Sequence, residues 1–178
     1  MPASKDSIRA MRHPQRWLAV LRVVVGLWFL KSLLTKLTIV LAWGFLPVPA
    51  ATDRWVTVMP KLIARYAAEN PIEWYRDFLL NVVIPNSHLF AHLTALGEVA
   101  IGISLTLGFL TTLGAFLGSI QVIFYGLAVQ HMSSGQQGFH VMLFSMMVAF
   151  FFARAGRYLG IDAWLVRRYP ASVWARLG

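Results

Sequence analysis

The chain has 178 residues, of which 58% are hydrophobic and 13% charged, and its mean hydropathy is +0.63. Soluble domains average about 45–50% apolar and about 25% charged residues, so this composition excludes an ordinary soluble domain and predicts an integral membrane protein. The chain has no cysteine, which excludes disulfides, thiolate metal sites, iron–sulfur clusters and a cysteine nucleophile within it.

The positive charge lies at the two ends of the chain. Two basic clusters flank the apolar part: Lys5, Arg9, Arg12, Arg16 and Arg22 before it, and Arg154, Arg157, Arg167, Arg168 and Arg176 after it. Such clusters are typical of cytoplasmic segments beside membrane spans and attract anionic lipid headgroups. The net charge of +9 therefore predicts membrane lipids as partners and argues against nucleic acid. The placement of a basic cluster at each end predicts a multi-pass protein of the cell (inner) membrane with both termini cytoplasmic.

The first apolar stretch runs from Trp17 to Leu46 and is followed by Pro47 and Pro49. It is longer than the roughly 20 residues that an upright span needs. Because proline does not continue a helix, we place the end of span one before Pro47 and its extent at roughly 20–46.

A loop of balanced charge follows at 50–87. Pro60 predicts the start of one short amphipathic helix there, and Asn70, followed by a proline, predicts the start of a second. The later apolar runs predict spans at roughly 88–107, 112–130 and 139–155, before a basic tail at 156–178. The sequence therefore predicts a single all-α domain, 1–178: a four-transmembrane-helix bundle with a helical extracytoplasmic loop between spans one and two.

Glu98 interrupts the apolar run of the second span. At about 1.5 Å of rise per residue, its carboxylate lies roughly 14 Å from the nearer end of the span. Burying a charge at that depth costs at least ~2.5 kcal/mol, so such a carboxylate has a partner or a function. We interpret it either as half of a structural ion pair that fixes helix register, or as a catalytic group in proton transfer or polar-ligand binding.

Two lysines of the first span are candidate partners for Glu98. If the span begins near Trp17, Lys31 approaches the depth of Glu98, and if it begins after Arg22, Lys36 does. We prefer Lys36, because that register keeps Arg22 at the inner interface. Lys36 is therefore the second catalytic candidate, although the register that decides between the lysines stays open.

Four histidines lie toward the outer side of the predicted bundle. His88 and His92 share one face of span two, His131 ends span three and His140 begins span four. Interfacial imidazoles of this kind bind backbone or water, contact a quinone carbonyl, or ligate a metal or haem. We take His92, His131 and His140 as candidate quinone contacts. No metal site is predicted, because no carboxylate spacing of a metal motif accompanies them.

Several motifs resemble the DoxX/DoxD family. The run Gly26–Leu37 has the family's Gly-x-x-Phe opening that ends in Lys-Leu, and Gly97-Glu98 precedes a Gly-x-x-Leu-x-x-Gly-x-x-Thr segment at 102–111. The run Gly156–Asp162 resembles the closing Gly-Arg and Gly-x-Asp, and 74–86 is most similar to the DoxD branch, the small subunit of thiosulfate:quinone oxidoreductase. The resemblance implies a four-helix membrane protein with redox partners, and it favours Lys36 as the partner of Glu98. Thiosulfate oxidation does not follow from it, because function varies within the family.

The first functional hypothesis is a membrane subunit of a quinone-linked oxidoreductase or of a respiratory or sulfur-metabolism complex, with quinone as the suggested cofactor and other subunits as partners. The alternative is a non-catalytic membrane anchor or assembly subunit of a larger complex, in which Glu98 and Lys36 only lock the bundle. A small transporter is a third reading, which the absence of a convincing internal repeat disfavours.

Overall fold

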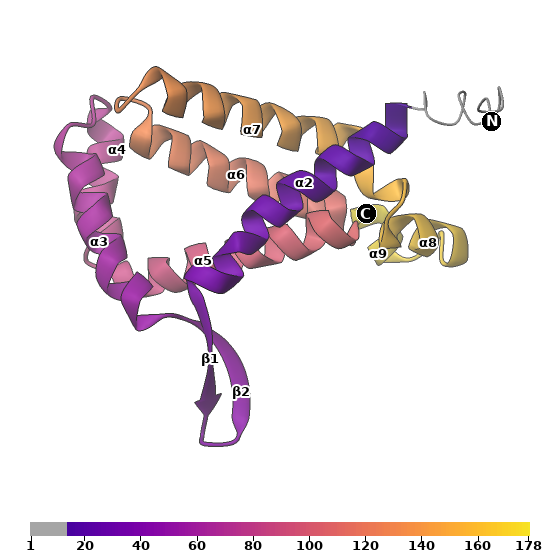
Figure 1. The fold of residues 1–178 in the computed structure, drawn as a ribbon, viewed down its shortest axis with the longest axis horizontal. Coiled ribbons are helices and arrows are strands. Elements are labelled where there is room, and N and C mark those ends of the chain that lie inside the picture. The colour runs from indigo at the N-terminus through magenta and orange to yellow at the C-terminus, as the bar shows by residue number, and fades with distance from the viewer. Residues whose placement is uncertain (1–13) are drawn as a thin grey trace, which may run out of the picture.

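The computed structural model describes residues 14–178, apart from the side chains of 175 and 176, so that Lys5, Arg9 and Arg12 lie outside the described residues. Within residues 14–178, four helices are long and apolar enough to cross a membrane, and they form a bundle (Figure 1). They are α2 (Pro14–Thr35), α5 (Ser87–Leu107), α6 (Thr111–Val129) and α7 (Ser134–Phe152). The predicted fold class, an all-α bundle of four spans, is confirmed.

Small residues bring the spans together in pairs. α2 packs along α5, where Gly102 lies so close that a Cβ on it would meet the backbone nitrogen of Leu30 at 2.8 Å. α6 packs along α7, where a Cβ on Gly118 would meet the sulfur of Met147 at 3.0 Å. Such residues allow the close backbone approach on which packing between membrane helices depends.

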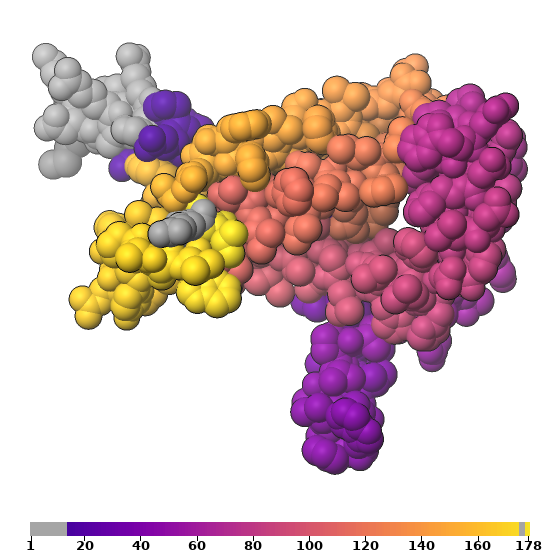
Figure 2. Space-filling view, turned by 180° about the vertical axis from the view of Figure 1, so that it is seen from behind, coloured from indigo at the N-terminus to yellow at the C-terminus, as the bar shows by residue number. Residues whose placement is uncertain are grey.

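Span one is shorter than predicted, and the extension to residue 46 is wrong. α2 ends at Thr35, and an antiparallel hairpin of β1 (Leu37–Ala42) and β2 (Leu46–Ala51) follows it. The hairpin projects sideways from the bundle (Figures 1 and 2). The β-branched residues of β1 favour a strand, and the turn takes positive φ angles at Trp43 (53°) and Gly44 (81°). Hydropathy alone does not separate such a hairpin from the end of a span.

The segment between spans one and two is helical, as predicted, although its first helix begins earlier. α3 (Asp53–Ala68) starts where Thr52 accepts a hydrogen bond from the backbone N–H of Trp55, so Pro60 lies inside the helix rather than at its start. Asn70 accepts a hydrogen bond from Ile72 N–H ahead of α4 (Glu73–Phe78), which continues into the π-helical turn η1 (Leu79–Val83). Figure 1 shows α3 and α4 across one end of the bundle.

The opposite end of the bundle holds the start of α2 and the C-terminal segment (Figure 1). α7 begins five residues before the predicted 139, because Ser133 caps it by accepting a hydrogen bond from Gln136 N–H. It ends at Phe152, three residues before the predicted 155, and Arg154 follows with a φ of 46°. The short helices η2 (Ala155–Arg157), α8 (Ile161–Arg168) and α9 (Val173–Leu177) form the basic tail.

Candidate functional site

The Glu98 carboxylate is the centre of the polar site within the spans. Its residue is only 6% exposed, and both of its oxygens lie 2.8 Å from the Lys36 ammonium. Ser32 donates a hydrogen bond to Oε2, and the Tyr125 hydroxyl donates one to Oε1 at 2.6 Å. A buried charge is tolerated when it is paired and hydrogen-bonded in this way.

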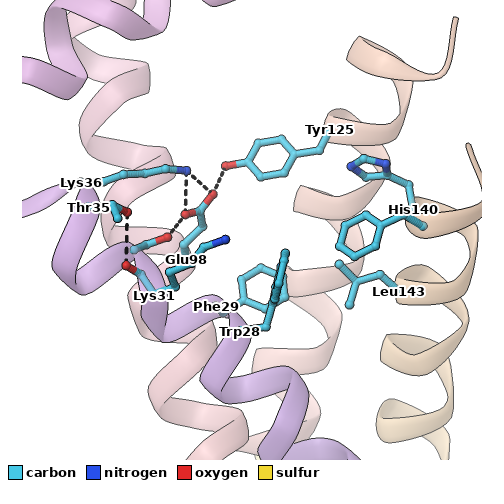
Figure 3. Close-up of a pocket in the computed structure, with 11 residues that line it drawn as sticks. Trp28, Phe29, Lys31, Thr35, Lys36, Glu98, Tyr125, His140 and Leu143 are labelled. Carbon is cyan, nitrogen blue, oxygen red and sulfur yellow. Dashed lines mark hydrogen bonds and ion pairs between the residues drawn. The ribbon is translucent and has the colours of Figure 1, made fainter. Parts of the chain in front are cut away.

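The site joins three spans (Figure 3). Ser32 comes from the last turn of α2, and Lys36 directly follows the helix, with its N–H donating to the Ser32 carbonyl at 2.9 Å, so the two side chains lie on one side. Glu98 comes from the middle of α5, and Tyr125 from α6. Of the two candidate lysines, Lys36 is the one that pairs with Glu98. The reason differs from the prediction, because Lys36 lies just beyond the end of a short α2 rather than inside a longer span.

Further polar groups hold the first ones in place. Gln121 lies one turn before Tyr125 on α6 and donates to its hydroxyl at 2.8 Å. The Lys36 ammonium lies 4.3 Å from the centre of the Trp55 ring, and Trp55 Nε1 donates to Thr94 Oγ1 on α5 at 3.2 Å. The ring face adds a cation–π attraction, so Trp55 ties the position of Lys36 to the start of α3.

A cavity of about 180 Å³ lies against this network. It is lined by Trp28, Phe29, Lys31, Ser32, Thr35, Lys36, Glu98, Tyr125, Phe139, His140 and Leu143. Trp28 of α2 contacts Phe139 of α7, with ring centres 5.7 Å apart. Lys31 also reaches the cavity, where its ammonium lies 3.9 Å from the centre of the Trp28 ring and has no acidic partner among the described residues. The lining therefore carries one cation more than it carries carboxylates.

Of the three histidines proposed as quinone contacts, only His140 lines this cavity. Its Nδ1 donates to the Gln136 carbonyl oxygen at 2.8 Å, so Nε2 is the ring nitrogen that remains for a ligand. His92 instead binds the His88 carbonyl oxygen and stacks on the His88 ring. The buried Nδ1 of His131 has no partner among the described residues.

Sequence reasoning missed Ser32, Tyr125 and Gln121. A signal for each was present, since Ser32 precedes Lys36 by one helical turn, and Gln121 and Tyr125 are polar residues one turn apart in an apolar span. The sequence does not show how α6 is rotated about its axis, and this rotation decides whether the Gln121 and Tyr125 side chains face Glu98.

A second buried polar cluster closes the other end of the bundle. Asp162 accepts hydrogen bonds from Leu110 N–H at 2.8 Å and Thr111 N–H at 2.9 Å, and so caps α6. Arg22 is fully buried beside it and donates to the Leu159 carbonyl at 3.1 Å. Arg157 lies at the surface of this cluster. The partial loss of its solvation and the nearby charge of Arg154 lower its pKa, and Asp162 opposes that shift. These contacts give the cluster a structural role.

The fold and the site define a class: a four-span membrane bundle with a buried Glu–Lys pair beside a small polar cavity. The chain belongs to the DoxD family, described as the TQO (thiosulfate:quinone oxidoreductase) small subunit, whose model matches residues 17–175. The family is thus one of membrane subunits of a quinone-linked oxidoreductase, and its description as a small subunit points to other subunits as partners. No curated protein and no solved structure matches the chain.

Proposed function

We propose that the chain is the quinone-exchanging subunit of a membrane oxidoreductase, and that the cavity beside Glu98 holds the quinone head group. The observation that carries the proposal is that the buried Glu98 carboxylate lines a cavity. Lys31 lines the same cavity and, unlike Lys36, forms no ion pair with an acidic residue in the described part of the chain. An ionisable group inside a membrane is by default a functional one.

The cavity suits a single ring in size and in chemistry. A cavity of about 150 Å³ accommodates benzene, and this one measures about 180 Å³. Trp28, Phe29 and Leu143 supply apolar contacts, Lys31 supplies a donor for a carbonyl oxygen, and His140 Nε2 supplies an acceptor for a hydroxyl. Trp28 of α2 and Phe139 of α7, whose rings are in contact, form one wall of the cavity.

The chain's own contribution is the handling of protons. A quinone, when bound, takes up two electrons and two protons as it becomes a quinol, and the electrons would come from a partner subunit. Glu98 holds a proton or a negative charge at the cavity wall, and Lys36 and Ser32 stabilise its charged form. Tyr125 and Gln121 continue a chain of exchangeable hydrogens into α6. Any persulfide chemistry belongs to another subunit, because this chain has no cysteine.

Substitution of Glu98 tests the catalytic role. We expect Glu98→Gln to lower quinone-linked turnover per assembled complex at least tenfold, in line with the ~10²–10⁴-fold contributions of acid–base groups. Glu69→Gln, the same change at an exposed carboxylate at the end of α3, should leave turnover unchanged. Equal turnover in the two variants would remove the proton role of Glu98.

Labelling with a photoreactive quinone analogue tests the location. Peptides that contain residues 28–36 or 139–143 should carry the label, and excess natural quinone should compete for it. Label confined to other segments would refute the assignment of this cavity, whatever the turnover of the Glu98 variant.

The second candidate function is a non-catalytic anchor. The specific observation in its favour is that Glu98 is hydrogen-bonded from both α2 and α6, as a lock between helices would be. In that case Glu98→Gln lowers the abundance of the complex, and activity per assembled complex stays unchanged.

A further inference from the structure

The β1–β2 hairpin begins directly after the end of α2, at a point that lies level with the middle of α5. At its base, Thr52 N–H donates to the Lys36 carbonyl at 2.9 Å, and Lys36 binds Glu98. Glu98 lies eleven residues after Ser87, the first residue of α5, which at ~1.5 Å per residue is roughly 16 Å from that end of the helix. The hairpin base is therefore level with the membrane interior.

The side chains of the hairpin suit that depth. Residues 37–52 include no charged residue, and the most exposed side chains are Ile39 (74%), Trp43 (83%) and Phe45 (76%). Figure 2 shows the hairpin standing clear of the other elements. These apolar side chains can face lipid. The backbone N–H and C=O groups of the hairpin, in contrast, need hydrogen-bond partners.

The two edges of the hairpin differ. Because Lys36 and Thr52 form a hydrogen-bonded pair, the alternation of an antiparallel ladder makes Leu37–Ala51, Ile39–Pro49 and Leu41–Pro47 the non-bonded pairs, whose backbone groups point outward. On β2 two of these outward positions are prolines, which have no N–H. On β1 they are Leu37, Ile39 and Leu41, which keep theirs.

The β1 edge therefore requires a partner. Within the described part of the chain, no other backbone or side chain bonds to the N–H of Ile39. Lipid cannot satisfy such a group, and open sheet edges that face lipid do not occur at hydrocarbon depth. Another strand can satisfy the edge, by pairing its own backbone with it.

We propose that the strand that covers this edge is β1 of a second copy of the chain, so that two hairpins form a four-stranded sheet in a symmetric dimer. A second copy in the same membrane offers the same open strand at the same depth. Antiparallel pairing about Ile39 is self-complementary, with Ile39 opposite Ile39 and Leu37 of one copy opposite Leu41 of the other. The prolines of β2 then form both outer edges, which keep carbonyl acceptors but offer no N–H at Pro47 and Pro49 for a further strand to pair with, and this stops the association at two copies.

The absence of native cysteine allows a direct test in native membranes. Bonded antiparallel partners have Cα atoms about 5.5 Å apart, within the roughly 4.4–6.8 Å that a disulfide spans. Ile39→Cys should therefore give a covalent dimer of this chain under mild oxidation. Val40→Cys is the matched control, because the two Val40 positions would be two residues apart along neighbouring strands, with Cα atoms roughly 8 Å apart, beyond the reach of a disulfide.

A mixed experiment fixes the register. Leu37→Cys and Leu41→Cys, carried by differently tagged copies, should cross-link when they are produced together, and neither should do so alone. Cross-linking of Val40→Cys as efficient as that of Ile39→Cys would overturn the proposal. So would an Ile39→Cys protein that reaches the membrane at normal abundance yet stays monomeric or links to a different polypeptide.

Discussion

At the scale of single residues, the Lys36–Glu98 pair places a buried carboxylate beside a partly buried ammonium within the bundle. Removing one partner of a buried ion pair leaves the other charge uncompensated, whereas removing both charges is often nearly neutral. We expect Lys36→Met to lower the free energy of unfolding by about 3 kcal/mol, the lower end of the range for such pairs because Lys36 is partly exposed. Adding Glu98→Gln should recover most of that loss.

Denaturant unfolding of the two single variants and the double variant in detergent measures this coupling. If the free energy lost in the double variant equals the sum of the losses in the two single variants, the ion pair adds no coupling, and Ser32 and Tyr125 alone satisfy the carboxylate.

Tyr75 gives a residue-scale prediction outside the spans. Its hydroxyl donates to the Phe124 carbonyl at 2.6 Å, and burial raises its pKa to about 12. The unfolded chain loses that proton near pH 10, so it binds fewer protons than the folded chain above that pH. The contribution of Tyr75 to stability should therefore be fully present below pH 10 and be lost as the pH rises from 10 to about 12.

Melting temperatures measured across this alkaline range, for the native chain and for Tyr75→Phe, isolate the effect from the other tyrosines. The variant should start lower, because it lacks the hydrogen bond, and should fall less steeply. Parallel curves would show that Tyr75 does not cause the alkaline loss.

At the scale of the elements, the packing of α2 on α5 depends on Gly102. A Cβ there would meet the Leu30 backbone nitrogen at 2.8 Å, and backbone of a packed helix cannot move aside cheaply. We expect Gly102→Ala to cost about 1–3 kcal/mol of unfolding free energy, the usual range for overpacking. Because Ser32 lies on α2 and Lys36 directly follows its last residue, the substitution should also weaken the site.

The matched control is Gly138→Ala on α7, where a Cβ would have no atom within 4 Å. It should be neutral or slightly stabilising, because alanine favours a helix by about 0.5–1 kcal/mol over glycine. A Gly102 variant as stable as the Gly138 variant would mean that α2 and α5 adjust freely.

The same scale shows what the sequence can predict. The four spans, the helical loop and a lysine partner for Glu98 follow from hydropathy, from caps and from a carboxylate that needs a counter-charge. The choice of Lys36 over Lys31 depends on where α2 ends, which these signals did not fix. The hairpin could not be predicted from the sequence, because the largely apolar residues 37–46 are compatible both with a strand and with the end of a helix. The contact of Tyr125 with Glu98, and the finding that His140 lines the cavity while His92 does not, depend on how each helix is rotated about its axis, which tertiary packing decides.

At the scale of the whole molecule, the two ends of the bundle are built differently. One end is covered by α3 and α4, which carry both acids and bases, and the other is closed by Asp162 and Arg22 beneath an arginine-rich tail. The Glu98 cavity lies between them, so a ligand from the lipid and a partner that docks on α3 and α4 would approach from different sides.

This asymmetry predicts the orientation in the membrane. Arginines concentrate on the cytoplasmic side, so we expect the tail to be cytoplasmic and the α6–α7 turn to face outward. Since the chain has no cysteine, Gly135→Cys and Ala171→Cys each introduce one thiol, at exposed positions on opposite ends of the bundle. A membrane-impermeant maleimide should label Gly135→Cys in intact cells, and Ala171→Cys only after the cells are permeabilised. The reverse pattern would show that the protein has the opposite orientation, with its arginine-rich tail outside the cell.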